Sequence, residues 1–124
     1  MPAQPHVAIA CGGTGGHYFP GIAVARELIA ADARVTLFIS EKEIDQRAAE
    51  NNADLIHIPL PAVGFNWRHP IRFLKGYRAA AKEVRRQFEK TPPHAILAMG
   101  GFTAAAPVQV GRGMGLSVFL HESN

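Results

Sequence analysis

The sequence predicts one α/β domain in which a parallel β-sheet lies between two layers of helices, a Rossmann-like doubly wound fold. Five short apolar segments alternate along the chain with four longer segments of helical pattern. Most of the apolar segments lack a polar face, which is typical of strands that helices cover on both sides of a parallel sheet. The chain has 124 residues, which is enough for one hydrophobic core.

The expected strands and helices alternate from one end of the chain to the other. The strands are expected at residues 6–10, 34–39, 55–58, 95–99 and 116–120, and the helices at 21–31, 41–51, 70–90 and 103–113. Pro70 suits a first helical turn because its missing amide is not needed there, and Pro92 and Pro93 stop the same helix. Pro107 counts against the last helix. Right-handed crossovers between the strands then give the strand order 3-2-1-4-5.

Composition excludes several classes of protein. Apolar residues make up 48% of the chain and charged residues 19%, which indicates a globular rather than a disordered chain. The single cysteine excludes an internal disulfide and suits a reducing compartment. The sequence has no signal-peptide pattern and no apolar run of about 18 residues, so we expect no membrane-spanning segment.

Positive charge is concentrated between Arg68 and Lys90. This segment holds eight basic and two acidic residues, so it carries a charge of +6, while the whole chain carries only +3. Apolar side chains are mixed with the cations at its start, and this composition suits an anionic bilayer surface. The expected membrane-contact residues are Trp67, Arg68, Ile71, Arg72, Phe73, Leu74 and Lys75. A merely solvated helix face is the alternative. No motif indicates a nucleic-acid partner.

Three unusual segments each follow a predicted strand directly. CGGTGGH (residues 11–17) follows the first strand, MGGFTAAAP (99–107) the fourth and HESN (121–124) the fifth. The carboxyl ends of parallel strands lie at the same edge of a sheet. We therefore expect the three segments to meet beside the first and fourth strands, where doubly wound sheets bind ligands.

The glycines of the first segment predict an anion site. Glycine adopts positive φ readily and lets a ligand approach backbone N–H groups, which applies to Gly12, Gly13, Gly15 and Gly16. A helix expected to begin near Pro20 points its positive end at the same space, which favours a phosphate or diphosphate. The spacing matches neither a dinucleotide fingerprint nor a P-loop. A tight turn with packing glycines is the alternative.

Three polar residues at the same edge, His17, Glu122 and Asn124, suggest catalysis or substrate binding. His17 lies where the first glycine segment becomes a helix, so its imidazole suits a base for a substrate hydroxyl or a partner for a phosphate. A hydrogen bond to the neighbouring loop is the alternative. Glu122 is placed to orient His17 or a loop, and the Asn124 amide suits a sugar hydroxyl. A turn at the end of the strand is the alternative for both.

The remaining histidines and the single cysteine do not form a metal site. We expect His57 and His94 to be structural, and His6 and His69 to lie at the surface. No pair of histidines or carboxylates has the spacing of metal ligands, so we expect no metal.

The segments GGTGGHYFPGIAVARELI, AILAMGGFTAAAP and HESN resemble the amino-terminal domain of the MurG family. The resemblance covers about residues 6–124. It implies the amino-terminal half of a GT-B fold, in an inverting N-acetylglucosaminyltransferase that converts lipid I to lipid II in peptidoglycan synthesis, without a metal or other cofactor. Residues 1–124 would be the acceptor-binding domain. The carboxyl-terminal domain that carries most contacts to UDP-N-acetylglucosamine would be absent from this sequence, so we expect no transfer by this chain alone.

The resemblance also implies roles for single residues. Residues 12–17 and the second loop, Gly100, Gly101 and Phe102, would hold the diphosphate of the polyprenyl-linked acceptor. Thr14, Gly15, Gly16 and Asn124 would reach the donor, and His17 would be the general base for the acceptor 4-hydroxyl. Residues 67–74 would lie on the membrane.

The family further implies a place in the cell. The protein would be peripheral, at the cytoplasmic face of the bacterial inner membrane, with contacts to other cell-wall synthesis proteins and a role in cell shape and division.

The sequence departs from the family in three places. Ser123 replaces a glutamine, residues 103–106 contain less glycine and serine, and residues 40–50 differ. A related sugar transferase with another lipid acceptor therefore remains open. So does a non-catalytic diphosphate-binding module that docks on a membrane. A nicotinamide oxidoreductase fits the sheet but lacks the glycine spacing and the acidic ribose partner.

Overall fold

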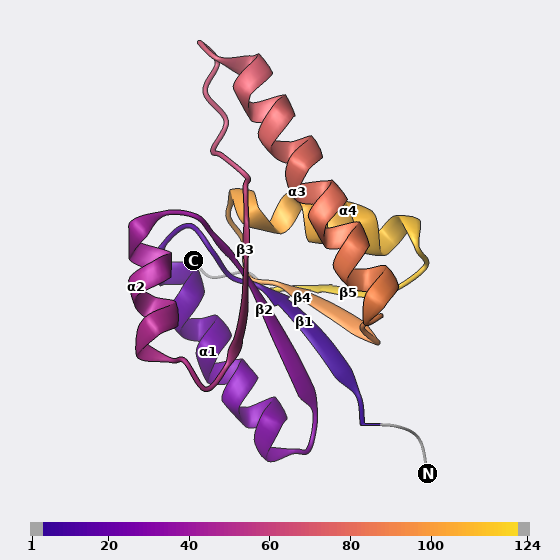
Figure 1. The fold of residues 1–124 in the computed structure, drawn as a ribbon. Coiled ribbons are helices and arrows are strands. Elements are labelled where there is room, and N and C mark those ends of the chain that lie inside the picture. The colour runs from indigo at the N-terminus through magenta and orange to yellow at the C-terminus, as the bar shows by residue number, and fades with distance from the viewer. Residues whose placement is uncertain (1–3, 122–124) are drawn as a thin grey trace.

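A computed structural model describes residues 4–121 of the chain and shows the predicted parallel sheet (Figure 1). The strand order is β3-β2-β1-β4-β5, and every neighbouring pair is parallel. The predicted fold class and strand order are therefore confirmed. The strands are β1 (His6–Ala10), β2 (Arg34–Ser40), β3 (Ile56–Leu60), β4 (Ala95–Ala98) and β5 (Ser117–Leu120).

Helices cover both faces of the sheet. They are α1 (Gly15–Ala30), α2 (Glu43–Asn51), α3 (Pro70–Lys90) and α4 (Ala105–Gly113), and a short 3₁₀ turn, η1 (Phe102–Ala104), precedes α4. Alternate residues of β1 point to opposite faces, so Ile9 packs with Tyr18 and Ala25 of α1, while Ala8 lies in the core formed with Val84 of α3. Each face of the sheet thus has its own hydrophobic core.

The first helix begins earlier than predicted, at Gly15 rather than at residue 21. The Thr14 carbonyl accepts the amides of His17 and Tyr18, at 3.2 and 3.1 Å, and this closes a helical turn before Pro20 is reached. Pro20 is therefore inside the helix, where its missing amide costs one hydrogen bond in the second turn. His17 consequently lies in the first turn of α1 rather than in a loop.

Other boundaries agree closely with the sequence predictions. Helix α3 has the predicted bounds, and α4 forms despite Pro107, because this proline lies in the first turn, where no intrahelical amide is required. Strand β3 contains Pro59 and is an edge strand, which is where a sheet tolerates proline.

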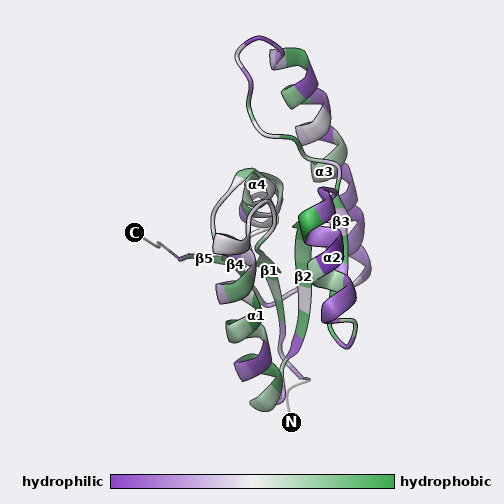
Figure 2. Ribbon diagram, turned by 90° about the vertical axis from the view of Figure 1, so that its left-hand side faces the viewer, coloured by the Kyte–Doolittle hydropathy of each residue, from purple (hydrophilic) through white to green (hydrophobic). Residues whose placement is uncertain are grey.

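Helix α3 and the segment before it extend far beyond the sheet (Figure 1). Only the part of α3 that crosses the sheet is buried, through Ala80, Val84 and Phe88. Figure 2 colours most of this part of α3 as hydrophilic on its outer side, whereas apolar residues interrupt the hydrophilic ones near its start. Among the described residues, no helix is both long enough and apolar enough to cross a membrane.

Candidate functional site

The two glycine loops meet at one edge of the sheet. Strands β1 and β4 are neighbours, so the loops that follow them leave the sheet side by side. The imidazole of His17 lies against the second loop: a Cβ added to Gly100 would be 3.1 Å from its Nε2, and one added to Gly101 would be 3.0 Å from its Nδ1. Both glycines have positive φ, 110° and 85°, so neither position accepts a side chain easily. We call residues 11–17 and 99–102 the glycine-loop edge.

The first two glycines of this edge face the protein interior. Gly12 packs on the end of β2, where an added Cβ would lie 2.7 Å from backbone atoms of Ile39. Gly13 has a φ of 101°, and an added Cβ would lie 2.9 Å from the Phe102 ring. Gly12 and Gly13 therefore serve close packing in a tight turn, which was the alternative to an anion site.

The Gly13 amide was predicted to bind a ligand. It instead donates a hydrogen bond to the side chain of Asp45. Oδ2 of Asp45 accepts the Gly13 N–H at 2.7 Å, the Ser40 N–H at 2.8 Å and the Ser40 hydroxyl. Asp45 lies in the first turn of α2 and is 1% exposed. Sequence reasoning missed this residue. The available signal was an aspartate in the first turn of a helix that follows a strand end at the same edge.

The amides of Thr14, Gly15 and Gly16 have no such partner. The first amides of a helix lack intrahelical acceptors, and within residues 4–121 no hydrogen bond uses these three as donors. No acidic side chain stands in the first turn of α1. Thr14 and Gly16 are exposed. The start of α1 therefore presents free donors and a positive helix end, which together suit an anion.

His17 is half-buried beside these amides. Its Nδ1 lies 3.1 Å from the Thr14 hydroxyl, which rotates to donate or to accept according to the tautomer. Among the described residues, no hydrogen bond reaches its Nε2. The ring therefore has one nitrogen held by the loop and one that remains for a ligand.

The ring of Phe102, in the second glycine loop, contacts the first loop and two neighbouring segments. It covers Gly13, and the Lys42 ammonium lies 5.0 Å from its centroid. A Cβ on Gly64 would lie 3.9 Å from the same ring, so the segment that leads to α3 passes beside the glycine-loop edge.

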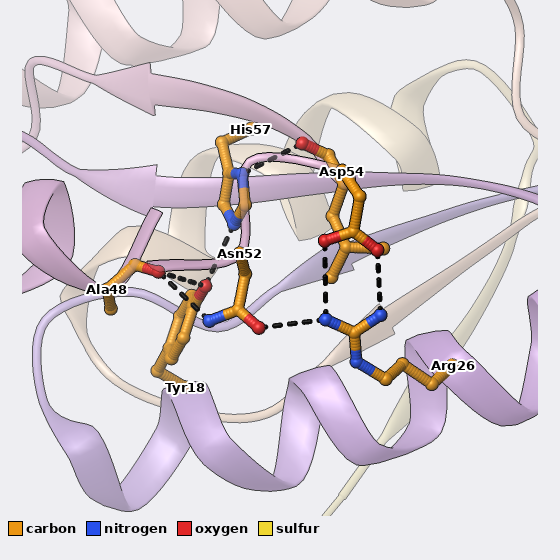
Figure 3. Close-up of polar contacts among 7 residues, drawn as sticks. Tyr18, Arg26, Ala48, Asn52, Asp54 and His57 are labelled. Atoms are coloured by element: carbon orange, nitrogen blue, oxygen red, sulfur yellow. Dashed lines mark hydrogen bonds and ion pairs between the residues drawn. The ribbon is translucent and has the colours of Figure 1, made fainter. Parts of the chain in front are cut away.

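A polar network that includes Tyr18 and Arg26 of α1 holds this helix against its neighbours (Figure 3). The Tyr18 hydroxyl donates to the Ala48 carbonyl at 3.2 Å and lies 2.9 Å from Nε2 of His57, whose Nδ1 is 3.0 Å from the Leu55 carbonyl. Burial lowers the pKa of His57 and raises that of Tyr18. His57 is structural, as predicted.

The same network continues to the surface. Arg26 donates to Asp54 at 2.9 Å and to the side-chain oxygen of Asn52 at 2.8 Å, as Figure 3 shows. The hydrogen bond from Arg26 holds the pKa of Asp54 below its usual range. These contacts fix the orientation of α1 and thereby the direction in which its first turn points.

Two further side chains, those of His6 and Cys11, are buried. His6 is 5% exposed, so the prediction of a surface histidine is wrong. Its Nε2 lies 2.8 Å from the Thr36 hydroxyl, its amide donates to Nδ1 of His94 at 3.0 Å, and burial lowers its pKa. Burial, with a smaller effect from Asp45, raises the pKa of Cys11 to about 12, so this thiol is no nucleophile at neutral pH.

Two further predictions concern metals and the end of the chain. In the part of the chain that the structure describes, no three His, Cys, Asp or Glu side chains are grouped as metal ligands would be. The expected contributions of Glu122 and Asn124 fall outside the described residues.

The predicted membrane-contact residues lie together where α3 leaves the molecule. Within residues 65–75, which we call the α3 tip, Phe65 and Ile71 are each 67% exposed and Trp67 75%. The Arg68 guanidinium stacks over the Trp67 ring at 5.4 Å. A hollow of about 420 Å³ is lined by Arg68, His69, Pro70, Ile71, Arg72 and Lys75. Leu74 is exposed as well, whereas Phe73 is half-buried against Phe65.

Comparison with known proteins gives consistent matches. The model of the glycosyltransferase family 28 N-terminal domain matches residues 7–124. Two curated relatives are named UDP-N-acetylglucosamine–N-acetylmuramyl-(pentapeptide) pyrophosphoryl-undecaprenol N-acetylglucosamine transferase. The protein from Rhizobium meliloti is 31% identical over 95% of this chain, and that from Geobacter sulfurreducens is 34% identical over 94%. The chain spans about a third of the length of these relatives, 32% and 33%.

Solved structures share the fold. The crystal structure of Acinetobacter baumannii MurG has a TM-score of 0.84 and 24% identity, and the alignment covers 98% of this chain and 36% of that one. The calicheamicin glycosyltransferase CalG4 has a TM-score of 0.68 at 14% identity, over 96% of this chain and 32% of that one. The predicted likeness to the amino-terminal half of GT-B glycosyltransferases is confirmed for the fold.

Proposed function

Because the chain belongs to glycosyltransferase family 28 as its N-terminal domain, we propose that it is the acceptor-binding part of an N-acetylglucosaminyltransferase. The donor is UDP-N-acetylglucosamine. The acceptor is the muramoyl 4-hydroxyl of undecaprenyl-diphosphate-linked N-acetylmuramyl-pentapeptide, so the reaction converts lipid I to lipid II. The names of the curated relatives support this pair of substrates.

One structural observation carries the proposal. Within residues 4–121, no hydrogen bond uses the Thr14, Gly15 and Gly16 amides as donors or reaches Nε2 of His17, and the His17 ring, in the same helical turn, lies against Gly100 and Gly101 of the second loop. An acceptor diphosphate bound at the helix end would therefore stand beside a nitrogen that accepts a proton.

The reaction is a single displacement. Nε2 of His17 takes the proton of the acceptor hydroxyl, and the hydroxyl oxygen forms a bond to the anomeric carbon of N-acetylglucosamine. The bond from that carbon to the diphosphate of UDP breaks, UDP leaves with the bonding electrons, and the configuration is inverted. The helix end of α1 and the second glycine loop hold the acceptor diphosphate and keep the hydroxyl in line.

The remaining two thirds of a full-length protein would supply most contacts to the donor. We therefore expect the full-length protein to transfer N-acetylglucosamine to lipid I in detergent, and residues 1–124 alone to transfer none. Turnover by the 124-residue chain would contradict this division of labour. Transfer by the full-length protein to a different polyprenyl-diphosphate sugar, and not to lipid I, would assign the alternative acceptor.

The α3 tip would bring this domain to its lipid-linked substrate. Exposed Phe65, Trp67 and Ile71 offer apolar contacts and the neighbouring cations offer charge, so an anionic bilayer suits both. Because the segment before α3 passes beside Phe102, such docking would place the glycine-loop edge near the membrane. The proposed location is the cytoplasmic face of the bacterial inner membrane.

A further inference from the structure

Asp45 is a buried carboxylate that the proposed reaction does not use. It is 1% exposed, and among the described residues it forms no ion pair. Burial of a charge without a cationic partner is costly unless hydrogen bonds compensate for the lost water. Here two backbone amides and one hydroxyl supply those bonds, and the positive end of α2 adds support.

The three donors come from two separate segments. The Gly13 amide belongs to the first glycine loop, and both Ser40 donors belong to the end of β2. The carboxylate therefore ties the loop, β2 and α2 together at one oxygen atom. Gly13, at its φ of 101°, donates its amide to Asp45, and a Cβ added there would lie 2.9 Å from the ring of Phe102.

The hydrogen bond from Gly13 to Asp45 also limits which backbone amides are available to a ligand. The Gly13 amide is already used, and the negative charge of Asp45 lies directly behind it, so an anion is disfavoured at that position. Within residues 4–121, the amides of Thr14, Gly15 and Gly16 have no acceptor. The carboxylate thus removes one possible contact and leaves the three at the helix end.

From this arrangement we infer that Asp45 is a positioning residue that fixes the first glycine loop so that a diphosphate binds at the start of α1. It acts through Gly13 and touches neither substrate. The inference rests on the proposed function for the identity of the diphosphate ligand, but it is tested separately from transfer. Its ligand chemistry is that of a pyrophosphate group.

Two substitutions separate the hydrogen bonds from the rest of the side chain. In Asp45→Ala the loop loses its acceptor, and the start of α1 is no longer held in one arrangement. In Asp45→Asn the amide oxygen is able to replace Oδ2 and to accept from Gly13 and Ser40. Val84→Ala, in the core on the opposite face of the sheet, is the control for a general loss of stability.

The experiment is calorimetric titration of the full-length protein with inorganic pyrophosphate, at a temperature where every variant is folded. We expect Asp45→Ala to raise the dissociation constant about 10- to 100-fold, by comparison with residues that hold other functional groups in place. Asp45→Asn is expected to recover most of this loss, and Val84→Ala to bind as the wild type does. A merely structural role would lower the folded fraction without changing the dissociation constant.

Three results would overturn the inference. They are wild-type affinity in Asp45→Ala, equal losses in Asp45→Ala and Asp45→Asn, and no pyrophosphate binding by the wild type. Transfer to lipid I by the wild type is measured in parallel, so that failure of the proposed function is seen independently of these results.

Discussion

The glycine-loop edge and the α3 tip are built in opposite ways, although Gly64, just before the tip, lies beside Phe102 of the edge. At the glycine-loop edge, side chains are absent where the backbone is tightly packed, and Gly12, Gly13, Gly100 and Gly101 each have atoms within 3.1 Å of an added Cβ. At the α3 tip, large apolar and basic side chains stand out into solvent. Ligand binding at the glycine-loop edge would depend on a fixed backbone geometry, whereas membrane binding by the α3 tip would depend on which side chains it exposes.

This difference indicates how each region tolerates change. A binding site made of backbone amides needs every turn in place, so single substitutions there have large effects. A surface that meets a bilayer gains a little from each residue, so single substitutions there have small, additive effects. The predictions below test this contrast, beginning with the largest expected effect.

Replacement of His17 by Gln should have the largest effect on catalysis. We expect kcat of the full-length protein for lipid I to fall about 10²- to 10⁴-fold, because the glutamine amide does not take a proton. The control is His94→Gln, at the opposite end of the sheet, for which kcat is expected to stay within about twofold, as for substitutions away from the reacting atoms. Nearly unchanged turnover in the His17 variant would remove the residue from the role of base.

Glycine at position 12 should be required for stability. In Gly12→Ala the new methyl group meets the backbone of β2, and we expect a loss of about 1–3 kcal/mol in the free energy of unfolding. The matched control is Gly113→Ala at the end of α4, where an added Cβ meets nothing within 4 Å. That change is expected to be neutral or to stabilise by up to about 1 kcal/mol. Urea unfolding measures both, and equal effects would contradict the contrast.

Removal of one cation from the α3 tip should weaken membrane binding modestly. We expect Arg72→Gln to lower partitioning into vesicles with anionic lipid about fivefold, because one basic residue near such a surface contributes about 1 kcal/mol. Raised salt should shrink the difference. Arg47→Gln on the exposed side of α2 is the control. Equal partitioning of the wild type into neutral and anionic vesicles would favour the merely solvated helix.

Acidification should destabilise the fold gradually. His6 and His57 have pKa values lowered by burial, so between their folded values and the ordinary 6.5 the unfolded chain binds more protons than the folded one. Stability is therefore fully present above pH 6.5 and is lost as the pH falls, by at most about 1.4 kcal/mol per pH unit for each histidine. Chemical unfolding between pH 7 and 5 checks this, and His6→Gln should flatten the slope. A slope of zero in the wild type would contradict the account.

Much of the fold could be predicted from the sequence because it depends on patterns that repeat. Alternation of apolar and helical segments gives the order of elements, and the handedness of crossovers gives the strand order. The start of α1 was missed because Pro20 is a strong local signal and four glycines surround Thr14, which is the N-cap residue but forms no side-chain cap. Local signals mark where a helix is able to begin, not where packing makes it begin.

The candidate site was predictable only in part, because local sequence signals do not show which residues pack together. The position of glycine loops after strands places them at one edge, and the structure brings them together around His17. Asp45 and His6 were missed because no periodicity shows that a single polar residue is buried. Contacts between residues far apart in the sequence accompany their burial: Asp45 accepts from Gly13, and His6 contacts Thr36 and His94.

The central claim is that a diphosphate binds to free amides at the start of α1 beside His17. A crystal structure of the full-length protein with a polyprenyl-diphosphate acceptor analogue tests it most directly. The account predicts diphosphate oxygens within hydrogen-bond distance of the Thr14, Gly15 and Gly16 amides, with Nε2 of His17 facing the acceptor sugar. A diphosphate bound elsewhere, or a His17 ring turned away from the sugar, would contradict it.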